Sequence, residues 1–141
     1  GKRLRRGWGN SIIPANVRHE LVDQVHWVGA LPAYASARRL FRSYGLFMGP
    51  TSGAAALVAM WFARKNPDAT TVVIMPDEGH RYADTVYNDA WLSALDGWPG
   101  SLPESPTRLD QICPAGEGDW TFYLWNRRTL SAVLALEEDS S

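Results

Sequence analysis

Two short stretches of the chain carry residue types that could do chemistry. In the first, Thr51, Ser52 and Gly53 open a nearly apolar run that ends at Lys65. Free N–H groups and the positive end of the helix dipole collect at a helix start, so hydroxyl groups and anions are stabilised there. The pattern suits a ligand cradle. An ordinary N-cap with small residues that pack closely explains the same letters, and spacing alone leaves both interpretations open.

The second stretch is residues 76–82, which follow directly after the β-branched run at 70–75. In open α/β sheets, ligands gather outside the carboxyl ends of the strands. The stretch holds two carboxylates, an imidazole, a guanidinium and a phenol, which suffice for acid–base work or anion binding. A solvated loop whose charges satisfy one another is the competing interpretation. The residues are Asp77, Glu78, His80, Arg81 and Tyr82.

The remaining polar candidates predict no metal centre. His19 and His26 lie seven positions apart, without the spacing of a zinc motif. Cys113 is the single cysteine, which excludes an internal disulfide framework and a multi-cysteine metal site and fits a reducing cytoplasm. The basic N-terminus could touch phosphates, although a solvated basic loop explains it equally.

Composition narrows the function classes further. The 141 residues match the common size of one domain, and 45% of them are hydrophobic. The net charge of −1 gives no whole-chain field that would attract nucleic acid. No apolar run approaches the ~20 residues of a membrane span. We therefore expect a cytoplasmic protein that binds neither nucleic acid nor membrane.

Hydrophobic periodicity predicts the elements that position these residues. Helical spacing predicts a helix at 33–44 that Gly45 ends, and a second helix at 52–65 that is apolar enough to be buried on more than one side. Strands are expected at 24–28 and 46–48, and the run at 70–75 is typical of a central parallel strand covered on both faces. This alternation indicates an α/β fold.

The chain after Gly97 has a different composition. Prolines, glycines and serines dominate residues 97–118, which predicts an irregular segment. A strand at 120–125 and a closing helix at 127–137 follow, with an acidic tail behind them.

Five blocks of the sequence, taken in order, resemble the C-terminal part of the cysteine synthase and cystathionine β-synthase family, which are fold type II pyridoxal-phosphate enzymes. The blocks cover roughly residues 7–91, and in combination they are specific. They are GWGNSIIP at 7–14, DQVHWV at 23–28, GLFMGPTSGAA at 45–55, VVIMPDEGHRYADT at 72–85 and YNDAW at 87–91.

The resemblance implies a three-layer αβα fold with a mostly parallel sheet, incomplete without the N-terminal half. Residues 1–96 would form the C-terminal part of the catalytic fold. Residues 97–141 would form a Pro/Gly-rich linker and a Trp-rich extension.

The resemblance also implies a site for pyridoxal 5′-phosphate. By it, the Thr51 hydroxyl hydrogen-bonds the pyridine nitrogen, Ser52 and Gly53 shape the helix start, and Pro76 and Asp77 lie beside the pyridine edge. A hydroxyl cannot hold the ring nitrogen protonated as a carboxylate would, so the ring is a weaker electron sink. The substrate entrance would be bordered by Gly7, Trp8, Gly9 and Tyr82.

The implied reaction is β-replacement or β-elimination on serine or an O-activated serine through an aminoacrylate, with sulfide, a thiol or an amine as nucleophile. Such an enzyme would be a transferase or lyase of amino-acid biosynthesis. The family holds its cofactor on a lysine in its N-terminal half. Lys2 and Lys65 are the only lysines of this chain, and neither has that context. We therefore expect no catalytic residue and no activity in this chain alone.

The missing lysine leads to an expected partner: the N-terminal half of the enzyme, as a separate chain or a missing segment, in a homo- or hetero-oligomer that binds a small amino acid. The alternative is a non-catalytic module derived from this fold. It would bind a partner through the fold remnant and Trp98, Trp120 and Trp125.

Overall fold

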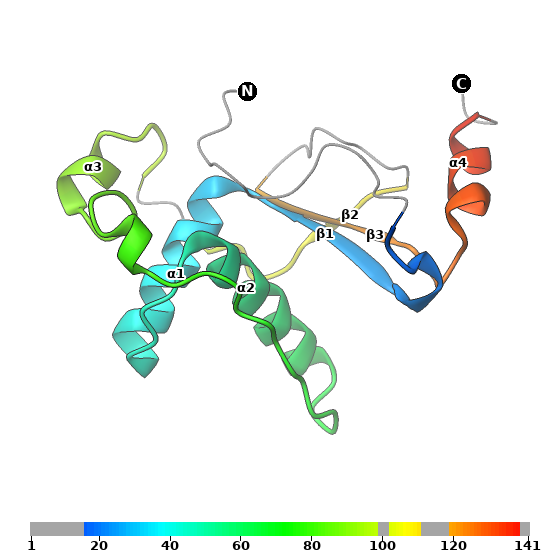
Figure 1. Ribbon diagram of the computed structural model, residues 1–141, viewed down its shortest axis with the longest axis horizontal. Helices are drawn as coiled ribbons and strands as arrows, with labels where there is room; N and C mark the ends of the chain where they lie inside the picture. Colours follow the sequence, from blue (N-terminus) through cyan, green and yellow to red (C-terminus); the bar gives the residue numbers. More distant parts are fainter. Residues whose placement is uncertain (1–15, 99–101, 111–118, 139–141) are drawn as a thin grey trace.

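A computed structural model describes residues 16–98, 102–110 and 119–138. The predicted residues Gly7, Trp8, Gly9 and Cys113 lie outside these ranges. Figure 1 shows helices gathered at one end of the molecule and a small sheet that runs from them toward the C-terminal helix. The elements are η1 His19–Leu21, β1 Gln24–Val28, α1 Ala30–Tyr44, α2 Pro50–Lys65, η2 His80–Tyr82, α3 Asp89–Ser93, β2 Thr107–Arg108, β3 Trp120–Leu124 and α4 Leu130–Glu138.

The sheet has three strands in the order β1-β3-β2. β1 and β3 pair antiparallel, with Gln24 opposite Leu124 and Val28 opposite Trp120, and only the short β2 runs parallel to β3. The described part of the chain is therefore mixed α/β, and its longest strand pair is antiparallel where a mostly parallel sheet was predicted. β3 belongs to the predicted C-terminal extension, so the sheet joins the regions on either side of Gly97.

Helix α1 confirms the helix predicted at 33–44 and starts three residues earlier. Gly45 ends it as expected, at φ 69°, a conformation that glycine adopts without steric cost. Ala33, Ala37 and Leu40 form its buried face. Phe41, which lies one helical turn after Ala37, is 47% exposed.

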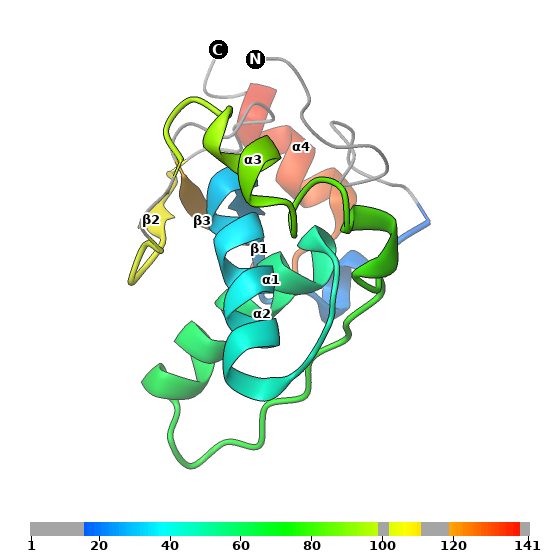
Figure 2. The same ribbon diagram turned by 90° about the vertical axis from the view of Figure 1, so that its left-hand side faces the viewer.

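Helix α2 confirms the helix predicted at 52–65 and begins at Pro50, whose fixed φ suits the first turn. It packs against α1, and the two helices lie side by side in Figures 1 and 2. Gly53 makes the contact: a Cβ there would lie 2.7 Å from the Ala37 nitrogen and would also collide with the Ala33 carbonyl oxygen. The glycine therefore sets how closely the helices approach.

The prediction of a buried central strand at 70–75 is wrong for the described structure. The segment is extended but joins no sheet, and Val72 and Ile74 are 86% and 80% exposed. A β-branched run becomes a central strand only when other strands pair with both of its edges. The described residues supply no such neighbours here, so the apolar side chains face outward.

Of the strand predicted at 46–48, the structure keeps one bridging residue. Met48 forms one isolated antiparallel bridge with Glu78, and Leu46 is 42% exposed. Even so, this single bridge joins the two stretches that the sequence singled out.

Two separate apolar clusters hold the elements together. One joins α1 to the segment around α3 through Tyr34, Ala37, Val86 and Leu92. The other lies between the sheet and α4 and contains Tyr123, Trp125 and Val133.

Tryptophans of the C-terminal region lie inside the protein. Trp120 is 3% exposed and Trp125 is 2% exposed, while Trp98 packs against the cluster at α3. Trp120 and Trp125 belong to the chain's own core and Trp98 packs against it, so these three side chains do not form an exposed tryptophan surface.

Helix α4 starts at Leu130, three residues later than predicted. Asn126 and Arg127 adopt φ values of 55°, which delay the helix, and the Thr129 hydroxyl accepts a hydrogen bond from the Ala132 N–H at 3.2 Å as its cap. In the described part of the chain, no helix has the length and apolar character needed to cross a membrane.

Candidate functional site

The start of α2 is the centre of the candidate site. Its N-cap residue is Gly49, which has no side chain to accept the free N–H groups, and its first turn holds no acidic residue. An uncapped helix start leaves donors unsatisfied and a positive dipole end exposed. The local sequence thus leaves this helix start in need of an acceptor from elsewhere.

The Asp77 carboxylate supplies that acceptor. The Thr51 N–H donates to Oδ2 at 3.1 Å, and the Ser52 N–H donates to Oδ1 at 2.8 Å. The fully buried Ser52 hydroxyl lies 2.5 Å from Oδ1 and 2.8 Å from the Asp77 carbonyl oxygen, and it accepts from the Asp77 N–H at 3.2 Å. A carboxylate 25 residues away in sequence from Ser52 therefore caps α2.

Backbone hydrogen bonds fix the loop that presents Asp77. The Gly49 N–H donates to the Asp77 carbonyl oxygen at 3.0 Å, and the Gly79 N–H donates to the Phe47 carbonyl oxygen at 2.9 Å. These bonds flank the bridge between Met48 and Glu78. The carboxylate is thus held by main-chain pairing as well as by its own hydrogen bonds.

Gly49 leaves room for the carboxylate. A Cβ at this position would collide with the Asp77 carboxylate and would lie 2.6 Å from the Tyr82 ring. Burial first, and the negative charge of Asp77 second, raise the pKa of the Tyr82 hydroxyl above the usual 10.0. Tyr82, which was predicted at the substrate entrance, therefore lies as a neutral phenol close to the Asp77 carboxylate.

Tyr87 and Arg38 support the site from behind, and the sequence did not single out either of them for this role. The Tyr87 hydroxyl contacts the carbonyl oxygens of Met48 at 2.6 Å and Ala37 at 3.3 Å, which ties the strand before α2 to α1. Arg38 donates to the Val86 carbonyl oxygen at 3.1 Å and pairs with Asp89 at 2.6 Å. No local pattern marks these residues, because their partners are 39 to 51 positions away in sequence.

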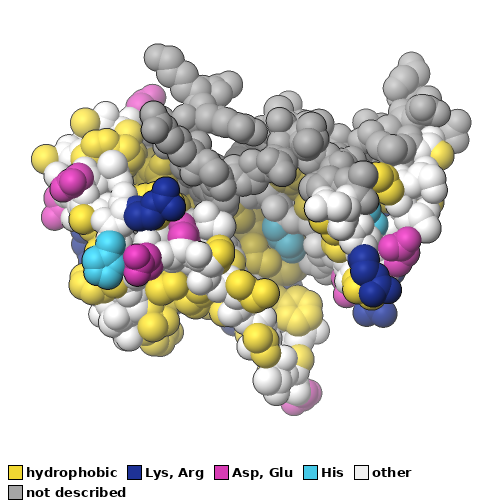
Figure 3. Space-filling view, viewed as in Figure 1, with side chains coloured by type: hydrophobic (Ala, Val, Ile, Leu, Met, Phe, Trp, Pro, Cys, Tyr) yellow, Lys and Arg dark blue, Asp and Glu magenta, His cyan; other side chains and the backbone are white. Residues whose placement is uncertain are grey.

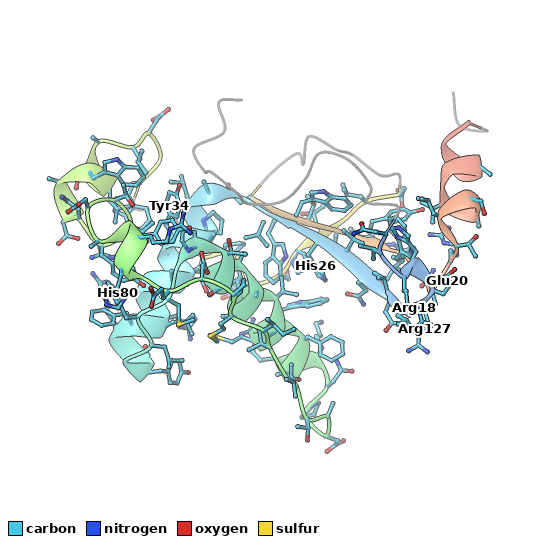
Figure 4. The ribbon with its side chains drawn as sticks, in the orientation of Figure 1. Arg18, Glu20, His26, Tyr34, His80 and Arg127 are labelled. Carbon is cyan, nitrogen blue, oxygen red and sulfur yellow. The ribbon has the colours of Figure 1, made fainter. Side chains whose placement is uncertain are left out.

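Pro76, Glu78 and His80, which belong to the same stretch, lie on the surface and not at this site. Pro76 is exposed. Glu78 and His80 lie 3.3 Å apart on the surface, with side chains 67% and 75% exposed. Figure 4 shows His80 at the helical end of the molecule. Of the charged groups in this stretch, Asp77 is the one that the structure brings to α2.

The Thr51 hydroxyl remains the group at this helix start that a ligand could use. Thr51 is half-buried, and within the described ranges its hydroxyl makes no hydrogen bond. No group of histidine, cysteine and acidic residues suited to a metal ion occurs among the described residues. The site is therefore a hydroxyl beside a capped helix start, suited to one hydrogen bond with a polar ligand atom.

A second cluster surrounds His26 on β1. Its ring stacks on Phe122 with centroids 5.4 Å apart and contacts Trp61 of α2 at 5.5 Å. The Trp120 indole donates to His26 Nδ1 at 3.2 Å, and Gln24 Oε1 lies 3.2 Å from Nε2. Figure 4 shows His26 between the sheet and α2.

Burial among these aromatic side chains lowers the pKa of His26 from 6.5 to about 4, so the ring is neutral at pH 7. The histidine thus has a structural role in this aromatic cluster. The Trp61 contact was not predicted, because α2 and β1 meet only in the tertiary structure.

The sequence is similar to two curated enzymes, both named N-(2-amino-2-carboxyethyl)-L-glutamate synthase. The protein of Ralstonia nicotianae is 34% identical over 96 residues, which are 67% of this chain and 28% of that protein. The protein of Cupriavidus metallidurans is 32% identical over 116 residues, 78% of this chain and 34% of that protein.

No protein-family model and no solved structure matches the chain. The alignments span about a third of the length of these relatives. The chain is thus homologous, at modest identity, to part of enzymes that carry this synthase name.

Proposed function

We propose that this chain is one part of a pyridoxal-phosphate-dependent enzyme of the cysteine synthase type, which replaces the β-substituent of serine or an O-activated serine with an amine. The amine that the relatives' name favours is that of L-glutamate.

The relatives' name is the observation that carries this proposal. A 2-amino-2-carboxyethyl group is the skeleton of serine without its hydroxyl, and in the named product it is attached to glutamate. Making this product from serine joins the glutamate nitrogen to the serine β-carbon and expels the β-substituent. This is the β-replacement reaction that the five sequence blocks imply.

The residues at the start of α2 fit one edge of the cofactor. The half-buried Thr51 hydroxyl would hydrogen-bond the pyridine nitrogen, and Ser52, Gly53 and Asp77 would hold that hydroxyl in place. When bound, the cofactor supplies an electron sink for the substrate α-carbon. The proposed role of Pro76 is limited to orienting Asp77.

The cofactor-binding lysine must come from outside the described part of the chain. Lys65 lies at the exposed far end of α2, 14 residues from Thr51, or about 21 Å along the helix axis. The partner in this proposal is therefore the N-terminal half of the enzyme, as a separate chain or a further segment, in a cytoplasmic oligomer.

Exposed apolar side chains support the need for such a partner. Val72 and Ile74 project from the extended segment after α2, and Phe62 on α2 is 39% exposed. Figure 3 shows hydrophobic atoms on the surface over α2 and the segment that follows it. A non-catalytic module is the second candidate, because the same side chains would serve a binding surface without any cofactor.

The direct test is a reaction of the protein, purified with any chain that accompanies it. We expect visible absorbance from bound pyridoxal phosphate, and formation of the glutamate adduct from an O-activated serine and L-glutamate, followed by mass spectrometry. A colourless sample that stays colourless after the cofactor is added would favour the binding module.

Thr51 is the residue to change first. Removing a buried hydrogen-bond partner costs about 1–3 kcal/mol, so Thr51→Ala should lower turnover roughly 5- to 150-fold and shift the cofactor spectrum while the fold persists. Thr51→Ser keeps the hydroxyl and is the matched control. Equal rates and identical spectra for all three proteins would contradict the role of Thr51.

A further inference from the structure

The cap of α2 has a consequence for which ligand atoms this site accepts. The start of a helix can bind a phosphate or carboxylate group when its N–H groups are free, because its dipole end is positive. Here the N–H groups of both Thr51 and Ser52 already donate to Asp77, at 3.1 and 2.8 Å. The protein's own carboxylate thus stands where an external anion would bind.

The carboxylate is held too firmly to be a chance surface contact. Ser52 is fully buried and its hydroxyl contacts Asp77 at both the side chain and the main chain. Gly49 approaches Asp77 so closely that any side chain at that position would collide with it. The Tyr82 ring closes the same space, because a Cβ at Gly49 would lie 2.6 Å from it. Each of these contacts would have to break before an external anion could replace Asp77.

We propose that Asp77 is a specificity-determining and positioning residue: it fills the anion site at the start of α2, excludes phosphate from it, and leaves the Thr51 hydroxyl for an uncharged or proton-bearing atom of the ligand. The negative charge of Asp77 offsets the positive partial charge at this helix end, which is about half an elementary charge.

This inference deepens the proposed function in one respect. If the proposed function holds, the atom beside Thr51 is the pyridine nitrogen, and another part of the enzyme holds the cofactor phosphate. The exclusion of anions itself rests only on the geometry of Asp77 and α2, so it can be tested without the cofactor.

The test compares thermal unfolding of the purified protein, with any accompanying chain, for Asp77→Ala, Asp77→Asn and the matched control Glu78→Gln. Glu78 is the adjacent carboxylate and lies on the surface beside His80. Loss of a helix cap should lower the Tm of Asp77→Ala by roughly 3–8 °C and that of Asp77→Asn, which keeps one acceptor oxygen, by less, while the Glu78 variant should melt within about 1 °C of the original protein.

Inorganic phosphate then reports whether the anion site has opened. We expect phosphate to raise the Tm of Asp77→Ala by several degrees more than that of the original protein or of Glu78→Gln. Ser52→Ala, which keeps both N–H donors and the carboxylate, should gain no such response. Asp77→Asn removes the charge but keeps the shape of the side chain, and its phosphate response decides the case in which Asp77→Ala is too unstable to measure. The inference is overturned if all the proteins respond equally to phosphate, or if the Asp77 variants melt with the control.

The cofactor gives a separate readout. Asp77→Asn should shift the absorbance maximum of bound pyridoxal phosphate, and Glu78→Gln should not. If the original protein binds no cofactor, the proposed function fails, while the unfolding and phosphate results still decide the role of Asp77.

Discussion

The two ends of helix α2 are built in opposite ways. At the N-terminal end, Ser52 is fully buried, Gly53 presses against α1 and Asp77 satisfies the free N–H groups. Toward the C-terminal end, Trp61 contacts the ring of His26, and the chain then leaves the protein core through Asn66 into an exposed extended segment.

The difference shows at which end of α2 substitutions should reduce stability most. The N-terminal end combines a helix–helix contact, a distant carboxylate and paired loops, so small changes there should be costly. The C-terminal end relies on aromatic packing and then on exposed apolar residues, which tolerate substitution better. This is the arrangement expected if the start of α2 carries function and its far end faces other parts of an assembly.

The largest effect should come from adding a side chain at the N-terminal end. Gly53→Val would place atoms against the backbone of Ala33 and Ala37, which cannot move aside, so we expect a loss of about 3 kcal/mol in the free energy of unfolding. Gly45→Ala is the matched control: it lies at φ 69° with nothing within 4 Å and should cost only about 1 kcal/mol. Denaturant titrations would measure both. Equal costs would contradict the idea that helix approach at Gly53 limits stability.

The His26 cluster should give the C-terminal end of α2 a pH dependence. The folded pKa of about 4 lies below the ordinary 6.5, so between these values the unfolded chain binds the extra proton. The stability that neutral His26 contributes to the folded protein is therefore fully present above about pH 6.5 and is lost progressively as the pH falls to about 4. Thermal unfolding measured across this range should show a Tm that falls as the pH is lowered from about 6.5 to about 4.

Two histidine variants would show whether His26 causes this dependence of Tm on pH. His26→Gln should flatten it, because the titrating ring that accepts from Trp120 is gone. His80→Gln removes an exposed imidazole and should leave the slope unchanged. A slope that survives in the His26 variant would place the pH dependence elsewhere.

The smallest effect should come from the exposed segment after α2. Val72→Ser combined with Ile74→Ser should change the unfolding free energy of this chain by less than about 0.5 kcal/mol, because both side chains face solvent. Val86→Ser, at a site 1% exposed, should cost about 2 kcal/mol or more by comparison. Calorimetry of the three proteins would check this order. A large loss in the double variant would mean that 70–75 is covered in the purified protein.

Local sequence by itself determined the two long helices and the two longer strands. Periodic apolar residues and the terminating Gly45 gave α1 and α2, and β-branched and aromatic runs gave β1 and β3, within a few residues of the observed ends. These features depend on neighbours a few positions away, which a sequence shows directly. The residue types at 51–53 and 77 also marked the two stretches that the structure joins.

Only the tertiary structure decided how those elements combine. It paired β1 with β3, separated by nearly a hundred residues, left 70–75 without strand neighbours, and brought Asp77 to an uncapped helix. Each outcome depends on which distant partner is present: a β-branched run is a buried strand only beside other strands, and a carboxylate is a cap only beside a helix that lacks one. The sequence shows which chemical groups are present, and the residues that contact them in the fold determine their roles.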